Sequence, residues 1–153
     1  AAHAAVREKK ITQMQYGLTF SYESGYLFIT LPSGRRLAYP RPRIENDTRF
    51  NKPISTYEGI EQKLWKRLKT YGPKLVENIV QAVSRDCLAT AIVRLHEAGY
   101  NIVFHVHDEV IAEMPNESGS VKEMCEIMSR SIEWAPGLPL RADGFECEYY
   151  QKN

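Results

Sequence analysis

The three adjacent residues His107, Asp108 and Glu109 are the group in this sequence best suited to chemistry. Apolar runs flank them, over residues 102–106 before the group and residues 110–112 after it. Such runs predict two strands of a hairpin, with the histidine and the acids at or near the turn. Acids are poor strand formers, so we expect a cation at the tip to explain them. Carboxylate oxygens suit Mg²⁺ or Mn²⁺.

The two acids are not expected to play the same part. Adjacent residues on a regular strand point to opposite faces, so both cannot simply chelate one ion. We therefore expect Asp108 to face the metal and Glu109 to support it. The alternative is a solvated hairpin tip that binds nothing.

A zinc site is the second metal hypothesis. His105 and His107 lie two residues apart, on one face of the predicted strand, but zinc needs a third ligand. His3 and His96 are the other histidines, and neither lies at a motif-like spacing. We favour one of the pair in the core and the other at the site, and keep a zinc hydrolase as a weaker alternative.

Charge is divided unevenly along the chain, although the net charge is only +1. Residues 33–74 carry eleven Lys or Arg against four Asp or Glu, and residues 104–153 carry four against ten. A basic segment can hold a polyanion and an acidic one can hold cations, as an enzyme of nucleic acids requires. Two ordinary solvated faces would give the same pattern.

Two groups of polar side chains could contact nucleic acid. Arg35 and Arg36 follow a turn, and guanidinium groups near an aromatic side chain such as Tyr39 suit a phosphate backbone. On a predicted helix, Asn78 and Gln81 begin a polar stripe, and an amide can both donate and accept at a groove edge. A charged surface strand and an exposed helix face are the alternatives.

The elements that must position these residues predict an α+β fold. The fold class we expect is a mixed, mainly antiparallel sheet with helices packed on one face. We expect a hairpin over 18–31, a strand over 35–39, a polar loop over 41–56, strand or short helix over 57–71, a helix over 73–97, a hairpin over 100–113, a helix over 118–134 and a last strand over 140–149.

Length and composition indicate one ordinary domain. The chain has 153 residues, of which 43% are hydrophobic and 25% charged. Its three cysteines are scattered, which suggests neither a zinc ribbon nor a disulfide framework and fits a reducing cytoplasm. No apolar run approaches the ~18–20 residues of a membrane span, so we expect no membrane partner.

Three motifs occur in an order that resembles family A DNA polymerases of the phage type. They are Gly34-Arg35-Arg36-Leu37, a helix with Gln81 and Asp86, and Val106-His107-Asp108-Glu109-Val110. The resemblance implies that residues 1–153 form one domain, the C-terminal part of the polymerase palm. Residues 1–16 are then interpreted as a remnant of the connection to the fingers.

The resemblance also implies roles for single residues. Asp108 would be one of two metal-binding catalytic aspartates, Glu109 its supporting acid, and His107 a neighbour of the primer terminus. Gln81 would contact the minor groove of the template–primer. Arg35 and Arg36 would lie near the nucleic acid.

The family's other catalytic aspartate and its nucleotide-gripping fingers helix have no counterpart in this sequence. Two-metal catalysis needs carboxylates from separate strands. We therefore expect a fragment of a polymerase that uses Mg²⁺ or Mn²⁺, dNTPs and a DNA primer–template, in the cytoplasm of a bacterial host. Alone it is expected to be inactive, and exposed palm surface favours self-association. The alternative is a non-catalytic nucleic-acid-binding or interaction module with a polymerase-like fold.

Overall fold

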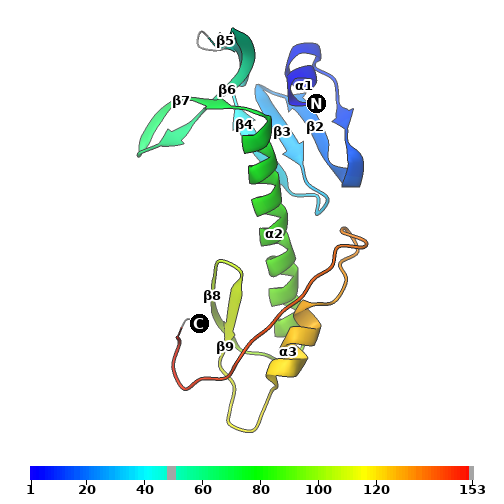
Figure 1. Cartoon of the computed structure of the whole chain (residues 1–153), viewed down its shortest axis with the longest axis vertical. Coiled ribbons are helices and arrows are strands. Elements are labelled where there is room, and N and C mark those ends of the chain that lie inside the picture. Colours follow the sequence, from blue (N-terminus) through cyan, green and yellow to red (C-terminus); the bar gives the residue numbers. More distant parts are fainter. Residues whose placement is uncertain (48–50, 152–153) are drawn as a thin grey trace. The chain divides into compact units, whose positions relative to one another are not determined.

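The computed structural model describes residues 1–47 and 51–151 (Figure 1). The chain divides into two compact units, Ala1–Val83 and Ser84–Asn153, and the boundary falls within its longest helix. Three α-helices and three separate sheets are present among the described residues, and every strand pairing there is antiparallel. The predicted α+β class is confirmed.

The first unit contains a four-stranded sheet in the order β1-β2-β3-β4. Its elements are α1 (Ala2–Glu8), β1 (Thr12–Gln13), the 3₁₀ helix η1 (Gln15–Gly17), β2 (Thr19–Glu23), β3 (Tyr26–Thr30) and β4 (Arg36–Pro40). The predicted hairpin and third strand are confirmed. Phe20, Leu27 and Ile29 of the sheet are buried in one cluster with Ala5 of α1, so the helix covers the apolar face of the sheet.

A second, three-stranded sheet consists of β5 (Arg43–Asp47), β6 (Lys52–Glu61) and β7 (Leu64–Thr70), in that order. The expectation of a loop over 41–56 is therefore wrong for 43–47 and 52–56, whereas residues 48–50 of that range lie outside the described residues. The polar residues predicted the loop, and the segment also contains Pro53, which cannot donate to a ladder. However, Pro53 pairs only with Asn46 of β5, and the ladder with β7 begins at Ser55. A residue without an N–H is therefore accommodated in β6.

The segment over 57–71, which the sequence left undecided, forms the β6–β7 hairpin. Glu61 pairs with Leu64, so Gln62 and Lys63 are a two-residue turn with φ of 52° and 63°. Positive φ at both central positions is the sign pattern of a type I′ turn, which usually contains Asn or Gly. The right-handed twist of the paired strands favours this turn even without those residues.

Helix α2 (Gly72–Glu97) confirms the predicted helix over 73–97. It ends in a Schellman motif: Tyr100 donates its backbone N–H to Leu95, Gly99 donates to His96, and Gly99 has a φ of 91°. Its apolar positions are not all buried, since Val76, Val80 and Val93 are each more than half exposed, whereas Leu75, Leu88 and Leu95 are buried.

The second unit is built around Leu95, Tyr100 and Ile127. The hairpin β8 (Ile102–Val106) and β9 (Glu109–Ala112) packs there with α3 (Val121–Met128). The hairpin predicted over 100–113 is confirmed. The Ser120 side chain caps α3 by accepting from the backbone N–H of Glu123.

Helix α3 is shorter than the helix predicted over 118–134. It ends at Met128, where Arg94 of α2 donates to the backbone carbonyls of Arg130 (3.0 Å) and Ser131 (2.8 Å). These carbonyls belong to the segment that follows the C-cap residue Ser129, so Arg94 holds the chain where it has left the helix.

The last strand predicted over 140–149 is also wrong, because those residues form no strand. The backbone N–H of Ala142 donates to Ser129 Oγ at 3.0 Å, and that of Gly144 donates to Asp143 Oδ1 at 2.9 Å. Side chains that accept from the backbone compete with a ladder. The alternating sequence therefore runs as an extended tail.

Candidate functional site

The acids that the sequence singled out lie at the tip of the β8–β9 hairpin. Val106 pairs with Glu109, which leaves His107 and Asp108 as a two-residue turn. All three of His107, Asp108 and Glu109 are exposed. None of the residues that the structure describes forms an ion pair with Asp108. Its carboxylate is therefore accessible to an external cation.

His107 has an uncommon backbone conformation, with a φ of 51°. Asp108 does not share it, so only the first central residue of the turn has positive φ, where glycine is usual. Non-glycine residues in this region are uncommon, and such strain clusters at functional sites. The turn therefore keeps an imidazole at a position where glycine would be easier to accommodate.

The structure provides no zinc site among the residues that it describes. Those residues contain no group of three or more His, Cys, Asp or Glu that could hold a metal ion. His105 is exposed and lies with Nε2 3.4 Å from Arg85 Nη2. The expectation that one histidine of the pair lies in the core is wrong, because His105 on β8 and His107 in the turn are both exposed.

Glu109 has a neighbour that the sequence did not suggest. Tyr150, in the C-terminal tail, donates its hydroxyl to Glu109 Oε2 at 3.3 Å. Its ring also contacts Phe104 edge-on, with centroids 5.2 Å apart. No periodicity or motif links residues 41 positions apart, so no signal in one sequence could have found this contact.

Asn78 and Gln81 belong to the first unit and have different surroundings. Asn78 donates Nδ2 to the Tyr39 hydroxyl at 3.0 Å, and that ring packs edge-on against Tyr57. Burial raises the pKa of Tyr39, although the Asn78 hydrogen bond acts to lower it. Gln81 is exposed and donates only a long hydrogen bond, 3.4 Å, to Glu77. Gln81 is the more accessible amide of the two.

Arg35 and Arg36 are held by contacts within the first unit. Arg35 donates to the backbone carbonyl of Ala82 on α2 at 2.8 Å. Arg36 lies over the ring of Phe28, 3.6 Å from its centroid, and donates to Glu23 at 2.8 Å. This hydrogen bond is the main cause of the lowered pKa of Glu23. Both guanidinium groups are exposed but oriented by their neighbours.

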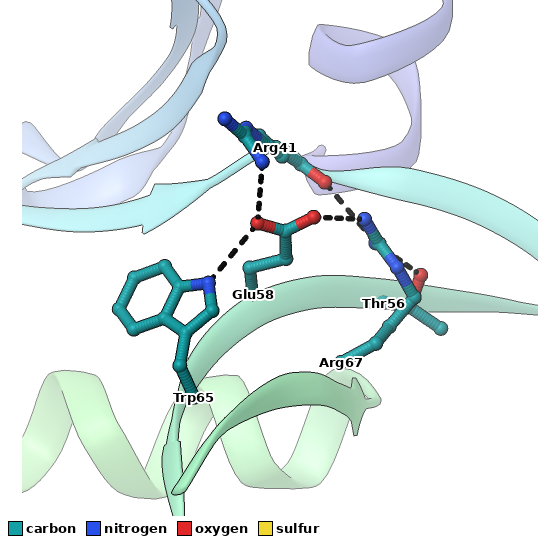
Figure 2. Close-up of polar contacts among 5 residues, drawn as sticks. All are labelled: Arg41, Thr56, Glu58, Trp65 and Arg67. Atoms are coloured by element: carbon teal, nitrogen blue, oxygen red, sulfur yellow. Dashed lines mark hydrogen bonds and ion pairs between the residues drawn. The ribbon is translucent and has the colours of Figure 1, made fainter.

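A second carboxylate, Glu58 on β6, is surrounded by donors, as Figure 2 shows. It accepts from Arg41 Nη1 at 3.0 Å, from Arg67 Nη2 at 3.0 Å and from the Trp65 indole at 3.2 Å. Arg67 also donates to the Arg41 carbonyl and to Thr56 Oγ1.

This network leaves Glu58 ionised. Burial acts to raise the pKa of its carboxyl, but the indole hydrogen bond and the charges of the two guanidinium groups outweigh burial and hold the pKa below its ordinary value. Arg41 and Arg67 are in turn ion-paired. Part of the basic segment is therefore neutralised within the second sheet and does not form an open cationic face.

Comparison with known proteins shows that the chain is homologous to part of a phage DNA polymerase. It is 55% identical over 154 residues to the DNA polymerase of Bacillus phage SP02, a match that covers 100% of this chain and 24% of that protein. It is 33% identical over 57 residues to the DNA polymerase of Mycobacterium phage D29, covering 35% of this chain and 9% of that protein. The chain thus spans about a quarter of the length of the SP02 relative.

The other comparisons are negative. No family model and no solved structure matches the chain. Within the part of the chain that the structure describes, no helix is both long and apolar enough to cross a membrane.

Proposed function

We propose that this chain is the C-terminal part of the palm of a family A DNA polymerase and acts in template-directed DNA synthesis. The observation that carries the proposal is the 55% identity to a phage DNA polymerase over the entire chain. The order of the three motifs over residues 34–110 supports the assignment to family A, and the antiparallel α+β fold is compatible with a palm.

Asp108 is the proposed metal ligand. Its exposed carboxylate at the hairpin tip is a hard oxygen donor of the kind that Mg²⁺ or Mn²⁺ prefers. Two such ions, when bound, promote attack by the primer 3′-hydroxyl and stabilise the leaving pyrophosphate. Asp108 would share them with a carboxylate from elsewhere in the polymerase. Glu109, at the start of β9, would support Asp108.

The proposed nucleic-acid contacts come from both units. His107 would contact the primer terminus from the hairpin turn. Gln81 would donate to or accept from the minor-groove edge of the template–primer, because its amide is exposed. Arg35 and Arg36 would contact phosphates, since both are exposed and already oriented. Asn78 would act beside Gln81 by fixing Tyr39.

The chain alone should not polymerise, because one carboxylate cannot hold two metal ions and no dNTP-binding helix is recognised in it. We therefore design the test around a chimera, in which these 153 residues replace the matching quarter of the Bacillus phage SP02 polymerase. We expect templated primer extension by the chimera with Mg²⁺ and dNTPs, and none by the 153-residue chain. An inactive chimera that is folded and binds DNA would count against the proposal.

Asp108→Ala separates this proposal from a non-catalytic nucleic-acid-binding module. The proposal expects the chimera to lose synthesis and to keep primer–template binding, while Glu113→Ala, another exposed acid just after β9, changes neither. If synthesis by the chimera survives Asp108→Ala, the catalytic assignment is wrong and the binding module is favoured.

We also propose that the isolated chain self-associates. The tip of the β6–β7 hairpin exposes Ile60, Leu64 and Trp65, each by 60% or more. Clustered apolar side chains of this kind are associated with interaction surfaces. Light scattering over a concentration series should show a rising mass, and a constant monomer mass at high concentration would contradict the proposal.

A further inference from the structure

The C-terminal tail contacts both strands of the hairpin that carries the acids, and both contacts are made by Tyr150. Its hydroxyl donates to Glu109 Oε2 on β9 at 3.3 Å. Its ring meets that of Phe104 on β8 at an interplanar angle of 72°, with centroids 5.2 Å apart. Edge-to-face pairs at this separation are favourable. One tyrosine therefore joins the tail to both strands just before the tip.

The surroundings of Tyr150 favour its protonated hydroxyl, which is the form that can donate a hydrogen bond. Burial raises the pKa of Tyr150, and the charge of Glu109 and the hydrogen bond to it raise that pKa further. At neutral pH the hydroxyl is protonated and can donate to the carboxylate. A hydrogen bond to a carboxylate restricts its orientation, as the groups that surround metal ligands commonly do.

We propose that Tyr150 is a positioning residue that fixes the Glu109 carboxylate next to Asp108. The inference rests on the proposed polymerase function, since Glu109 matters there as the acid that supports the metal ligand. Tyr150 itself touches neither metal nor substrate. Its hydroxyl sets the orientation of Glu109, and its ring holds the tail against β8.

The contact can be tested in the 153-residue chain, without any assay of synthesis. Tyrosine labelled with ¹³C at Cζ gives one NMR signal per phenol, and Tyr150→Phe assigns the signal of interest. We expect this signal to titrate above the ordinary pKa of tyrosine and to titrate at lower pH in Glu109→Gln. The matched control is Tyr149→Phe, which changes the neighbouring, largely exposed tyrosine and should leave the titration unchanged. An unchanged titration in Glu109→Gln would overturn the contact.

The positioning role is tested in the chimera. Tyr150→Phe keeps the ring and removes the hydroxyl, so we expect kcat to fall by about 10-fold, at the lower end of the range for supporting groups at metal sites, with KM for dNTP unchanged. Tyr149→Phe should match the parent chimera. A parallel loss in kcat and DNA affinity, or no loss, would overturn the role.

The failures of the two proposals can be told apart. An inactive parent chimera overturns the polymerase function, and with it the positioning role. An active chimera that is insensitive to Tyr150→Phe overturns the positioning role alone.

Discussion

Glu58 and Asp108 are both carboxylates on antiparallel hairpins, but their surroundings are opposite. Glu58, on β6, accepts from Arg41, Arg67 and Trp65 and is only 18% exposed. Asp108, in the β8–β9 turn, is exposed and has no ion-pair partner among the residues that the structure describes. A carboxylate already neutralised by guanidinium groups has little left to offer a metal ion, whereas an open one can bind it.

The contrast indicates that Glu58 stabilises the fold, whereas Asp108 is available for chemistry. The Glu58 network connects the β4–β5 turn with β6 and β7, so its removal should loosen the second sheet. The Asp108 carboxylate supports no other described element by an ion pair, so its removal should leave the fold intact. Substitution of Glu58 should therefore change stability, and substitution of Asp108 should change synthesis.

The largest expected effect is on synthesis by Asp108→Asn, which preserves shape and removes charge. Groups that merely support metal ligands cost about 10–100-fold, so loss of the ligand should lower the extension rate of the chimera more than about 100-fold. The unfolding free energy of the 153-residue chain should change by less than about 0.5 kcal/mol, as for an exposed site. Urea denaturation and primer extension measure the two effects. A large loss of stability would show that Asp108, like Glu58, stabilises the fold.

The next largest expected effect is a loss of stability at the strained turn of His107. His107→Val places a β-branched residue at a φ of 51° and should lower the unfolding free energy by about 1–3 kcal/mol. The control, His107→Gly, removes the same imidazole without the backbone penalty. Its unfolding free energy should equal or exceed that of the parent chain. Equal stability of the two variants would show that the turn changes its conformation.

The pH dependence of stability tests Glu58. Its pKa is lower in the folded chain than its ordinary value of 4.5, so its contribution is fully present above pH 4.5 and is lost as the pH falls through the lower, folded value. Glu58→Gln should lower the urea midpoint at pH 7 and flatten the acid part of the profile. Trp65→Phe removes one of the donors and should give a smaller change. A profile unaffected by Glu58→Gln would contradict the network.

The smallest expected effect concerns the other two-residue turn. Gln62→Asn combined with Lys63→Gly gives the β6–β7 hairpin the sequence that a type I′ turn favours, and should stabilise the chain by a few tenths to about 1 kcal/mol. Primer extension by the chimera should be unchanged, because this turn carries none of the proposed site residues. Calorimetry can detect the gain, and a loss of stability would show that the turn differs from type I′.

Periodicity predicted the elements in which apolar spacing dominates. Helix α2 and the β8–β9 hairpin were predicted because their apolar residues recur at helical or strand spacing between clear breaks. The position of His107, Asp108 and Glu109 at the hairpin turn follows from the same pattern. Their chemical roles rest on resemblance to the polymerases.

The errors arise where partners distant in sequence decide the local structure. Residues 41–56 are polar, so local propensity favoured a loop, although β5 and β6 pair with neighbouring strands in a ladder. The segment after α3 is held by Arg94, and Glu109 accepts a hydrogen bond from Tyr150. Side-chain contacts over such separations leave no periodic signal in a single sequence.

The start of β6 has a consequence for how this chain behaves at high concentration. Lys52 and Pro53 occupy the part of β6 that pairs with β5 but not with β7, where backbone groups could otherwise recruit a strand from another molecule. A charged residue followed by one without an N–H is a poor template for such recruitment. This stretch of β6 is therefore a poor site for edge-to-edge pairing with another molecule.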